Sequence, residues 1–354
     1  MRHGYQSIER RGVPPYRKQR FRDPNCAATV ALPLVLLEEV GVLLNRPPRE
    51  VNDALLMEKC SDFAKFQIWP LRTRLDAKAW LANFQDVDLP LARHLLNAFM
   101  YFNDDLTRQL FLAAVQGISV LQSWKDLRTG DVFDNWAAFL QSINVTYVTG
   151  EVPSPADSGH IFVRKARDHA NIPEGQIFKP EEVLERILLH NDHSPVVFVD
   201  DFVGSGDQFN ETWERKYNIG GVLNSFRDVY FALEQAGTPL EVYYAPAVCT
   251  KYGFGRIRLR CKGVEISAGN ILDERYNVFH PESLVWPAGM VADGQALVRR
   301  QSLDLGFPDD KSEWGLFGYH GLGLAIGFAH KTPDASIPLF RYRGENWRPL
   351  VKDV

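Results

Sequence analysis

The sequence predicts an α/β protein in which a parallel sheet is flanked by helices and preceded by a helical N-terminal region. From about residue 140, short apolar runs alternate with helical patterns, which is typical of right-handed βαβ units. The run Val196 to Val199 is β-branched or aromatic without polar interruption, as expected of a buried parallel strand. Between about 75 and 122, leucines and aromatic residues recur at helical spacing.

We divide the sequence into a basic arm at residues 1–25, a helical region at 26–130 and an α/β domain with a C-terminal tail at 131–354. The apolar stretch 27–43 predicts a helix that packs on the rest. One helix face is predicted from the spacing of Leu91, Leu95, Leu96, Phe99 and Met100, and a further helix from Leu106, Leu110 and Phe111.

The α/β domain is predicted element by element. Strands are expected at Val145 to Val148, Ile161 to Val163, Val196 to Val199, Leu240 to Val248, Val264 to Ile271 and within Gly321 to Phe328. Helices are expected at Lys179 to His190, where Pro180 suits the first turn, and from about 209 to 236, where Gly237 ends the segment. The tail from Pro333 to Leu350 is expected to fold back over the core.

Composition excludes several classes of protein. Of 354 residues, 45% are hydrophobic and 24% are charged, as in ordinary globular proteins. The net charge, 40 − 44 = −4, predicts no general affinity for nucleic acid or membranes. No apolar run approaches the roughly 20 residues of a membrane span, and no apolar signal-peptide core follows Met1. We therefore expect a cytoplasmic protein whose four scattered cysteines are reduced.

A basic segment occupies residues 9–23 near the start of the chain. Its cationic residues are Arg10, Arg11, Arg17, Lys18, Arg20 and Arg22. One interpretation is a solvated arm, and the other is a patch that contacts a polyanion or a partner protein. Weak nucleic-acid binding through residues 10–22 therefore stays open.

Residues 195–209 carry the strongest functional signal. Asp200 and Asp201 follow the apolar run and are expected at the carboxyl end of its strand, where open α/β sheets bind ligands. The turn Gly204-Ser205-Gly206 can direct the amides of Val203 to Gln208 at an anion, above a following helix. Two carboxylates for a diol beside amides for a phosphate suit a ribose 5-phosphate. The alternative is an ordinary strand–turn–helix of a Rossmann-like fold.

This arrangement resembles the ribose-phosphate signature of the type I phosphoribosyltransferases. A second segment, Phe162-Val163-Arg164-Lys165 followed by Asp168-His169, is similar to the basic catalytic segment of orotate phosphoribosyltransferases, with Arg167 at the position of a lysine. The resemblance implies that Arg164, Lys165, Arg167 and His169 neutralise a pyrophosphate leaving group, from a loop that closes over the site. It also implies that Ser158 and Gly159 bind substrate. The alternative is a solvated basic loop.

Taken together, three motifs resemble the phosphoribosyltransferase-like proteins of bacterial conflict and antiphage-defence loci. They are Trp80-Leu81-x-Asn83-Phe84, Val199 to Gly206, and Lys331 to Phe340 with Trp347 to Leu350. The resemblance implies a ribose-phosphate or nucleotide ligand bound with Mg²⁺ near Asp200 and Asp201. It implies ribosyl or phosphoribosyl transfer or glycosidic cleavage, or alternatively a non-catalytic nucleotide sensor that acts through a protein partner. A homo-oligomer is also open.

The chain departs from this pattern at two loop positions. Asp207 stands where biosynthetic phosphoribosyltransferases commonly have a hydroxyl residue, and its carboxylate is expected either to repel a 5′-phosphate or to cap the helix near Gln208. Gly204 replaces a threonine or an acid. Four further residues carry weaker expectations: Asp273 as a base-side contact or a strand-end cap, Tyr252 at the rim of the site, and His320 and His330 as structural residues.

Overall fold

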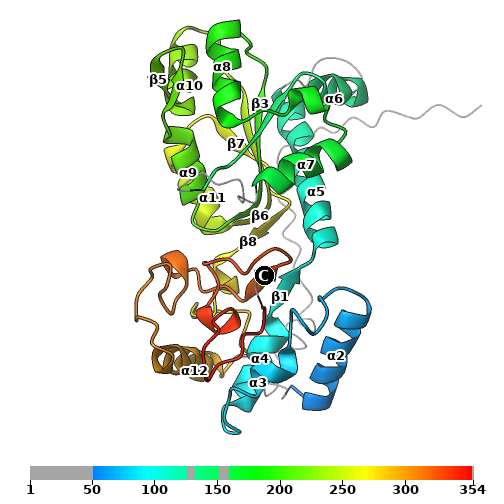
Figure 1. Cartoon of the computed structure of the whole chain (residues 1–354), viewed down its shortest axis with the longest axis vertical. Helices are drawn as coiled ribbons and strands as arrows, with labels where there is room; N and C mark the ends of the chain where they lie inside the picture. The colour runs from blue at the N-terminus through cyan, green and yellow to red at the C-terminus, as the bar shows by residue number, and fades with distance from the viewer. Residues whose placement is uncertain (1–50, 126–131, 151–158, 353–354) are drawn as a thin grey trace, which may run out of the picture. The chain divides into compact units, whose positions relative to one another are not determined.

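The computed structural model describes residues 51–125, 132–150 and 159–352 (Figure 1). The chain divides into two units, residues 1–47 and 48–354, and every described residue belongs to the second. The α-helices are α2 (Asp53–Lys65), α3 (Ala77–Leu81), α4 (Leu89–Ala98), α5 (Asp104–Lys125), α6 (Val132–Leu140), α7 (Gly159–His169), α8 (Pro180–His190), α9 (Asp207–Glu214), α10 (Phe226–Gln235), α11 (Lys251–Arg260) and α12 (Val291–Asp304). The strands are β1 (Met100–Phe102), β2 (Asn144–Tyr147), β3 (Val196–Val203), β4 (Tyr217–Ile219), β5 (Val222–Asn224), β6 (Val242–Thr250), β7 (Val264–Ile266), β8 (Asn270–Leu272) and β9 (Ile326–Phe328).

A five-stranded parallel sheet forms the centre of the fold and confirms the predicted α/β class. Its order is β2-β3-β6-β7, and β8 pairs with the end of β6 beyond β7. In the register of the two central strands, Val196 lies beside Val242 and Val203 beside Cys249. The central position of β3 explains its uninterrupted apolar sequence, because both of its faces are covered.

Helices cover both faces of this sheet, as Figure 1 shows. On β3, Val196 and Phe198 face a core shared with α8, α9, α10 and α11. The alternate residues Val197 and Val199 face a second core shared with α5, α6 and α7. The period of two along a strand therefore decides which helices each residue contacts.

The sequence prediction was wrong for one segment of the α/β domain and incomplete for another. Ile161 to Val163 is not a strand but lies within α7, and only Phe162 and Val163 of the three are buried. The helices expected from about 209 to 236 are α9 and α10, and the hairpin β4–β5, which was not predicted, separates them. Gly220 and Gly221 form its turn with φ values of 59° and 89°, which is the backbone of a two-residue hairpin turn.

Two other predicted strands are confirmed only in part. The run 264–271 forms two short strands, β7 and β8, separated at Gly269, where an added Cβ would lie 2.0 Å from the carbonyl oxygen of Leu110. The late strand is limited to β9, which pairs in parallel with β1 in a separate two-stranded sheet. Met100 opens β1 instead of extending the helix that contains Leu95.

A separate hydrophobic core, here called the tail core, joins the N-terminal helices to the C-terminal tail, as predicted for the tail. The indole N–H of Trp80 donates to the carbonyl oxygen of Leu339 at 2.8 Å, and its ring stacks on Phe340. Asn83 exchanges two hydrogen bonds with the backbone of Arg348. The first and third sequence motifs therefore pack against each other.

Some predictions concern residues that the structure does not describe. The basic arm, the apolar stretch 27–43 and Cys26 lie outside the described residues. The other three cysteines, Cys60, Cys249 and Cys261, are free thiols in buried positions. None of the helices in the described ranges combines the length and apolar character that a bilayer span requires.

Replacing Trp80 with alanine should show how much the tail core contributes to the stability of the protein. Trp80 is fully buried, so Trp80→Ala is expected to lower the free energy of unfolding by about 3–5 kcal/mol. Trp314 is 60% exposed and contacts Arg341 through its ring face, so Trp314→Ala should cost about 1 kcal/mol or less. Urea denaturation measures both, and equal losses would contradict the packing described.

Candidate functional site

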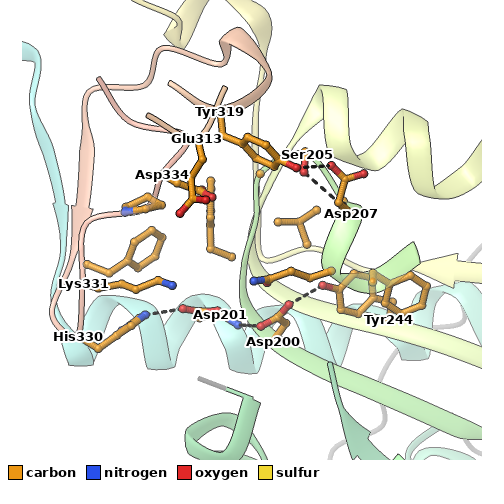
Figure 2. A pocket seen from close by; sticks show the side chains of 18 residues that line it. Asp200, Asp201, Ser205, Asp207, Tyr244, Glu313, Tyr319, His330, Lys331 and Asp334 are labelled. Atoms are coloured by element: carbon orange, nitrogen blue, oxygen red, sulfur yellow. Dashed lines mark hydrogen bonds and ion pairs between the residues drawn. The ribbon is translucent and has the colours of Figure 1, made fainter. Parts of the chain in front are cut away.

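A cavity of about 290 Å³ lies at the carboxyl end of β3 and is the candidate site (Figure 2). It is lined by β3, by the loop that leads into α9, by one residue of β6 and by the segments that precede and follow β9. The residues that line it are Asp200, Asp201, Phe202, Val203, Gly204, Ser205, Gly206, Asp207, Gln208, Phe209, Tyr244, Glu313, Tyr319, Phe328, His330, Lys331, Pro333 and Asp334. The structure thus brings together both predicted acids and the whole predicted loop.

Asp200 and Asp201 lie inside β3 and not at its tip, because pairing with β6 continues through Val203. Neighbouring strand residues point to opposite faces, so the two side chains have different surroundings. Asp200 is 3% exposed, accepts a hydrogen bond from the hydroxyl of Tyr244 at 2.7 Å and accepts another from the amide of Asp201 at 2.9 Å. Burial, followed by the negative charge of Asp201, raises the pKa of Asp200 well above its ordinary value.

Asp201 faces the other way and interacts with His330 (Figure 2). The Nε2 atom of His330 is hydrogen-bonded to the carboxylate of Asp201. His330 follows β9, whose Phe328 stacks on Phe102 of β1 and contacts Phe202 of β3. The pairing of β1 with β9 therefore brings the histidine to the acid, and the expectation that His330 is merely structural overlooked this contact.

The loop after β3 is held by α11 and by Thr250, the residue that caps the start of this helix. The hydroxyl of Thr250 donates to the carbonyl oxygen of Gly204 at 2.5 Å, and the guanidinium of Arg256 donates to that of Ser205 at 3.2 Å. Gly206 has a φ of 82°, a conformation that favours glycine. An added Cβ at Gly253 would lie 2.4 Å from the carbonyl oxygen of Gly204, so only glycine permits this approach.

Because α11 holds the loop carbonyls, the loop amides remain available. Within the described ranges, the N–H groups of Gly204, Ser205 and Gly206 donate to no protein acceptor. The next amide, of Asp207, is bonded to the hydroxyl of Ser205 at 3.3 Å. Free amides at the start of a helix are suited to an anion or a ligand hydroxyl.

Asp207 neither caps α9 nor points away from the loop. Gly206 is the capping residue and has no side chain to do so. The Asp207 carboxylate instead pairs with Arg256 at 2.7 Å and with Nε2 of His320 at 2.6 Å. Burial alone would raise the pKa of Asp207, but hydrogen bonds from Arg256, Ser205 and His320 outweigh burial and lower it.

The four basic residues of the second sequence motif lie on helix α7 and not on a loop. Arg164 and His169 are exposed, and Arg167 pairs with Asp168 and Glu174. Lys165 lies over the ring of Phe162 and 3.9 Å from Asp104. None of the four lines the cavity, so the structure does not bring them to the two acids.

The other described residues that the sequence singled out near the site, Gly159, Asp273 and Tyr252, do not line the cavity either. Ser158 lies outside the described residues, and Gly159 is buried at the start of α7, where an added Cβ would lie 2.7 Å from the carbonyl oxygen of Val148. Asp273 accepts from the amide of Arg275 and acts as a cap. The hydroxyl of Tyr252 lies 3.3 Å from Nδ1 of His320, the histidine that contacts Asp207.

The chemistry of the lining favours hard cations. Five carboxyl groups line the cavity, from Asp200, Asp201, Asp207, Glu313 and Asp334, and Lys331 is the one lysine or arginine among its described lining residues. Mg²⁺ prefers such oxygen ligands and commonly takes the rest from substrate. Among the described residues, no group of three or more His, Cys, Asp or Glu could hold a metal alone. The lining thus offers oxygen ligands of the type that Mg²⁺ prefers.

The contact between α11 and the loop can be tested with two glycines of one helix. Gly253→Ala is expected to lower the free energy of unfolding by about 1–3 kcal/mol, because its methyl group would collide with the carbonyl oxygen of Gly204. Gly255 lies two residues away with open space around it, so Gly255→Ala should instead stabilise by up to about 1 kcal/mol. Urea denaturation of both variants should give shifts of opposite sign.

The raised pKa of Asp200 predicts how stability depends on pH. Above the ordinary pKa of an aspartate, the unfolded chain loses this proton while the folded chain keeps it, so stability falls as the pH rises toward the folded value. Asp200→Asn removes the titration and retains similar hydrogen bonds to Tyr244 and to the amide of Asp201. The variant should therefore melt at a higher temperature than the natural chain at pH 7, with the difference shrinking near pH 4. Equal melting temperatures at pH 7 would contradict a neutral Asp200.

Comparisons with known proteins identify the family of the chain. Neither the curated proteins nor the solved structures include a match to the chain. The model of the PRTase-CE family matches residues 77–352, a range that includes α3, the acid pair, the loop and the tail. Because this range covers most of the 354 residues, the chain belongs to the phosphoribosyltransferase-like PRTase-CE family.

Proposed function

We propose that the chain binds a ribosyl compound, as a nucleotide or ribose phosphate, and transfers its ribosyl or phosphoribosyl group or cleaves its glycosidic bond. One observation carries this proposal. A single cavity joins a paired-acid strand to a loop whose carbonyls are held by α11 and whose amides have no acceptor within the described ranges. The family relationship supports the same general function.

The two acids have different proposed roles. Asp201 accepts hydrogen bonds from the ribose hydroxyls, since its carboxylate lines the cavity and is oriented by His330. Asp200 keeps its proton and contributes a neutral carboxyl that is fixed by Tyr244. The amides of Gly204, Ser205 and Gly206 bind the 5′ end of the sugar, as a phosphate or a hydroxyl.

The cavity also supplies charge for the reaction. Its acids stabilise the positive charge that develops on the sugar as the bond at C1 breaks. Bound Mg²⁺, held by Asp201 and by ligand oxygens, would offset the negative charge of a phosphorylated leaving group. Lys331 lines the same cavity and can assist in this role.

The proposed reaction exchanges one bond at C1 of the ribose for another. The bond from C1 to the leaving group breaks, the leaving group keeps the electron pair, and water or an acceptor base forms the new bond to C1. The attacking group then loses a proton. When Nε2 of His330 donates to Asp201, Nδ1 carries a lone pair and accepts this proton.

A non-catalytic nucleotide sensor is the second candidate, and the position of α7 favours it. Arg164, Lys165, Arg167 and His169 are the residues that the resemblance assigns to the leaving group, yet none lines the cavity. A protein whose cavity lacks these cations can still bind a nucleotide and signal to a partner protein. The defence setting implied by the resemblance is compatible with either candidate, and plaque counts on bacteria with and without the gene test it.

Incubation with labelled phosphoribosyl pyrophosphate, NAD and nucleotides in the presence of Mg²⁺ separates the two candidates. Released base, pyrophosphate or a new ribosyl product supports the enzyme. Saturable binding without any product supports the sensor. Absence of both binding and turnover for every compound contradicts the proposed function.

Asp201→Asn is expected to weaken binding of the ligand identified in this way at least tenfold, because it removes the charge that the ribose hydroxyls and Mg²⁺ require. Asp273→Asn is the matched control, since Asp273 follows strand β8 of the same sheet but does not line the cavity. Calorimetry should give unchanged affinity for the control. If both variants bind as tightly as the natural chain, the ligand does not use Asp201.

A further inference from the structure

Hydrogen-bond donors from two separate segments converge on the carboxylate of Asp207. Arg256 of α11 lies 2.7 Å from it. From the turn after Gly318, Nε2 of His320 lies 2.6 Å away and the hydroxyl of Tyr319 lies 3.3 Å away (Figure 2 shows Tyr319 beside Asp207). The carboxylate of Asp207 therefore accepts hydrogen bonds from residues that are distant from each other in the sequence.

These donors are of the kind that bind phosphate. A guanidinium group forms directional, charge-assisted hydrogen bonds with phosphate oxygens, and the neighbouring loop amides of Gly204 to Gly206 have no acceptor within the described ranges. Arg256 also holds the carbonyl of Ser205 at 3.2 Å, so it is fixed beside the loop. A carboxylate of the protein thus lies where the loop would otherwise present cations to a ligand.

The backbone of His320 is fixed by its surroundings. Its φ is 56°, a left-handed conformation that few residues other than glycine adopt, although histidine, like asparagine and aspartate, adopts it more often than most. The amide of His320 is held by the carbonyl oxygen of Lys311 at 2.9 Å. Such strained residues persist where the surrounding structure fixes them, often at functional sites.

The charge of the cavity opposes a second anion at this position. Asp201, Glu313 and Asp334 line the same cavity, with Lys331 as the one lysine or arginine among the described lining residues. The lowered pKa of Asp207 keeps its carboxylate ionised at neutral pH. A phosphate monoester would bring about two more negative charges to a place where Asp207 already neutralises Arg256.

We propose that Asp207 determines specificity by taking the place of a ligand's 5′-phosphate, so that the chain prefers ribosyl compounds whose 5′ position carries a hydroxyl group over their 5′-monophosphates. This inference rests on the proposed function, because it concerns the same cavity. It assigns the free loop amides to the 5′ oxygen of the sugar and assigns Arg256 and His320 to Asp207.

The test compares each of the four common ribonucleosides with its own 5′-monophosphate, by calorimetry with Mg²⁺ present. For the natural chain, the nucleoside of at least one pair should bind at least as tightly as its monophosphate. Asp207→Ser frees Arg256 and His320, so it should shift the ratio of the two affinities toward the monophosphate at least tenfold. If the serine variant fails to fold, Asp207→Asn replaces it in the test. This variant retains the shape of the side chain and should shift the ratio in the same direction.

Two further variants identify the cause of such a shift. Glu214 forms the other ion pair between α9 and α11, with Arg260 at 2.8 Å, and does not line the cavity. Glu214→Gln should therefore leave the ratio unchanged, whereas a general loosening of the two helices would move it. Adding Arg256→Gln to Asp207→Ser should abolish the gain in monophosphate affinity.

The possible outcomes are distinct. A natural chain that prefers the monophosphates tenfold, or an Asp207→Ser variant with an unchanged ratio, overturns the inference and leaves the proposed function standing. If no nucleoside or monophosphate binds the natural chain or any variant, the inference fails. The proposed function fails as well only when phosphoribosyl pyrophosphate and NAD also show neither binding nor turnover.

Discussion

The contact between helix α11 and the loop after β3 is the constraint on which the site depends. Thr250 and Arg256 hold the carbonyl oxygens of Gly204 and Ser205, and a peptide group whose oxygen is fixed on one side presents its hydrogen on the other. The close approach is possible because Gly253 has no side chain. The direction of the loop amides is therefore set by the neighbouring helix, and not by the loop sequence alone.

The alternation of side chains along β3 then gives the two acids unequal chemistry. Asp200 points toward Tyr244 and the helices α8 to α11, where burial raises its pKa well above the ordinary value, whereas Asp201 points toward His330. Two identical side chains at adjacent positions thus have different surroundings, and the first of them holds its proton more strongly than a free aspartate does. A similar division of roles is how many enzymes obtain both proton donors and proton acceptors from carboxyl groups.

Local sequence patterns predicted the parts of the site that lie on one continuous segment. The apolar run of β3, the acid pair and the glycine turn follow each other in the chain, and the structure places all of them at one cavity. His320 and His330 could not be assigned in this way, because they reach the acids only through the pairing of β1 with β9 and through a turn with a left-handed residue. The signal for His330 was its place just after a strand candidate, where ligands of parallel sheets bind. Residues 161–163 misled because a three-residue apolar run fits one face of a helix as well as a strand.

The packing of the tail on the N-terminal helices has a consequence for the way the chain is made. The hydrogen bond from Trp80 to Leu339 joins positions that are 259 residues apart, and Phe340, Trp347 and Leu350 belong to the same core. During synthesis, helices α3 and α4 emerge from the ribosome long before these partners exist. Until then, the apolar faces of the two helices are exposed to water or bound by chaperones. Closing so long a loop slows folding, so this half of the protein acquires its native packing only after translation has reached the tail.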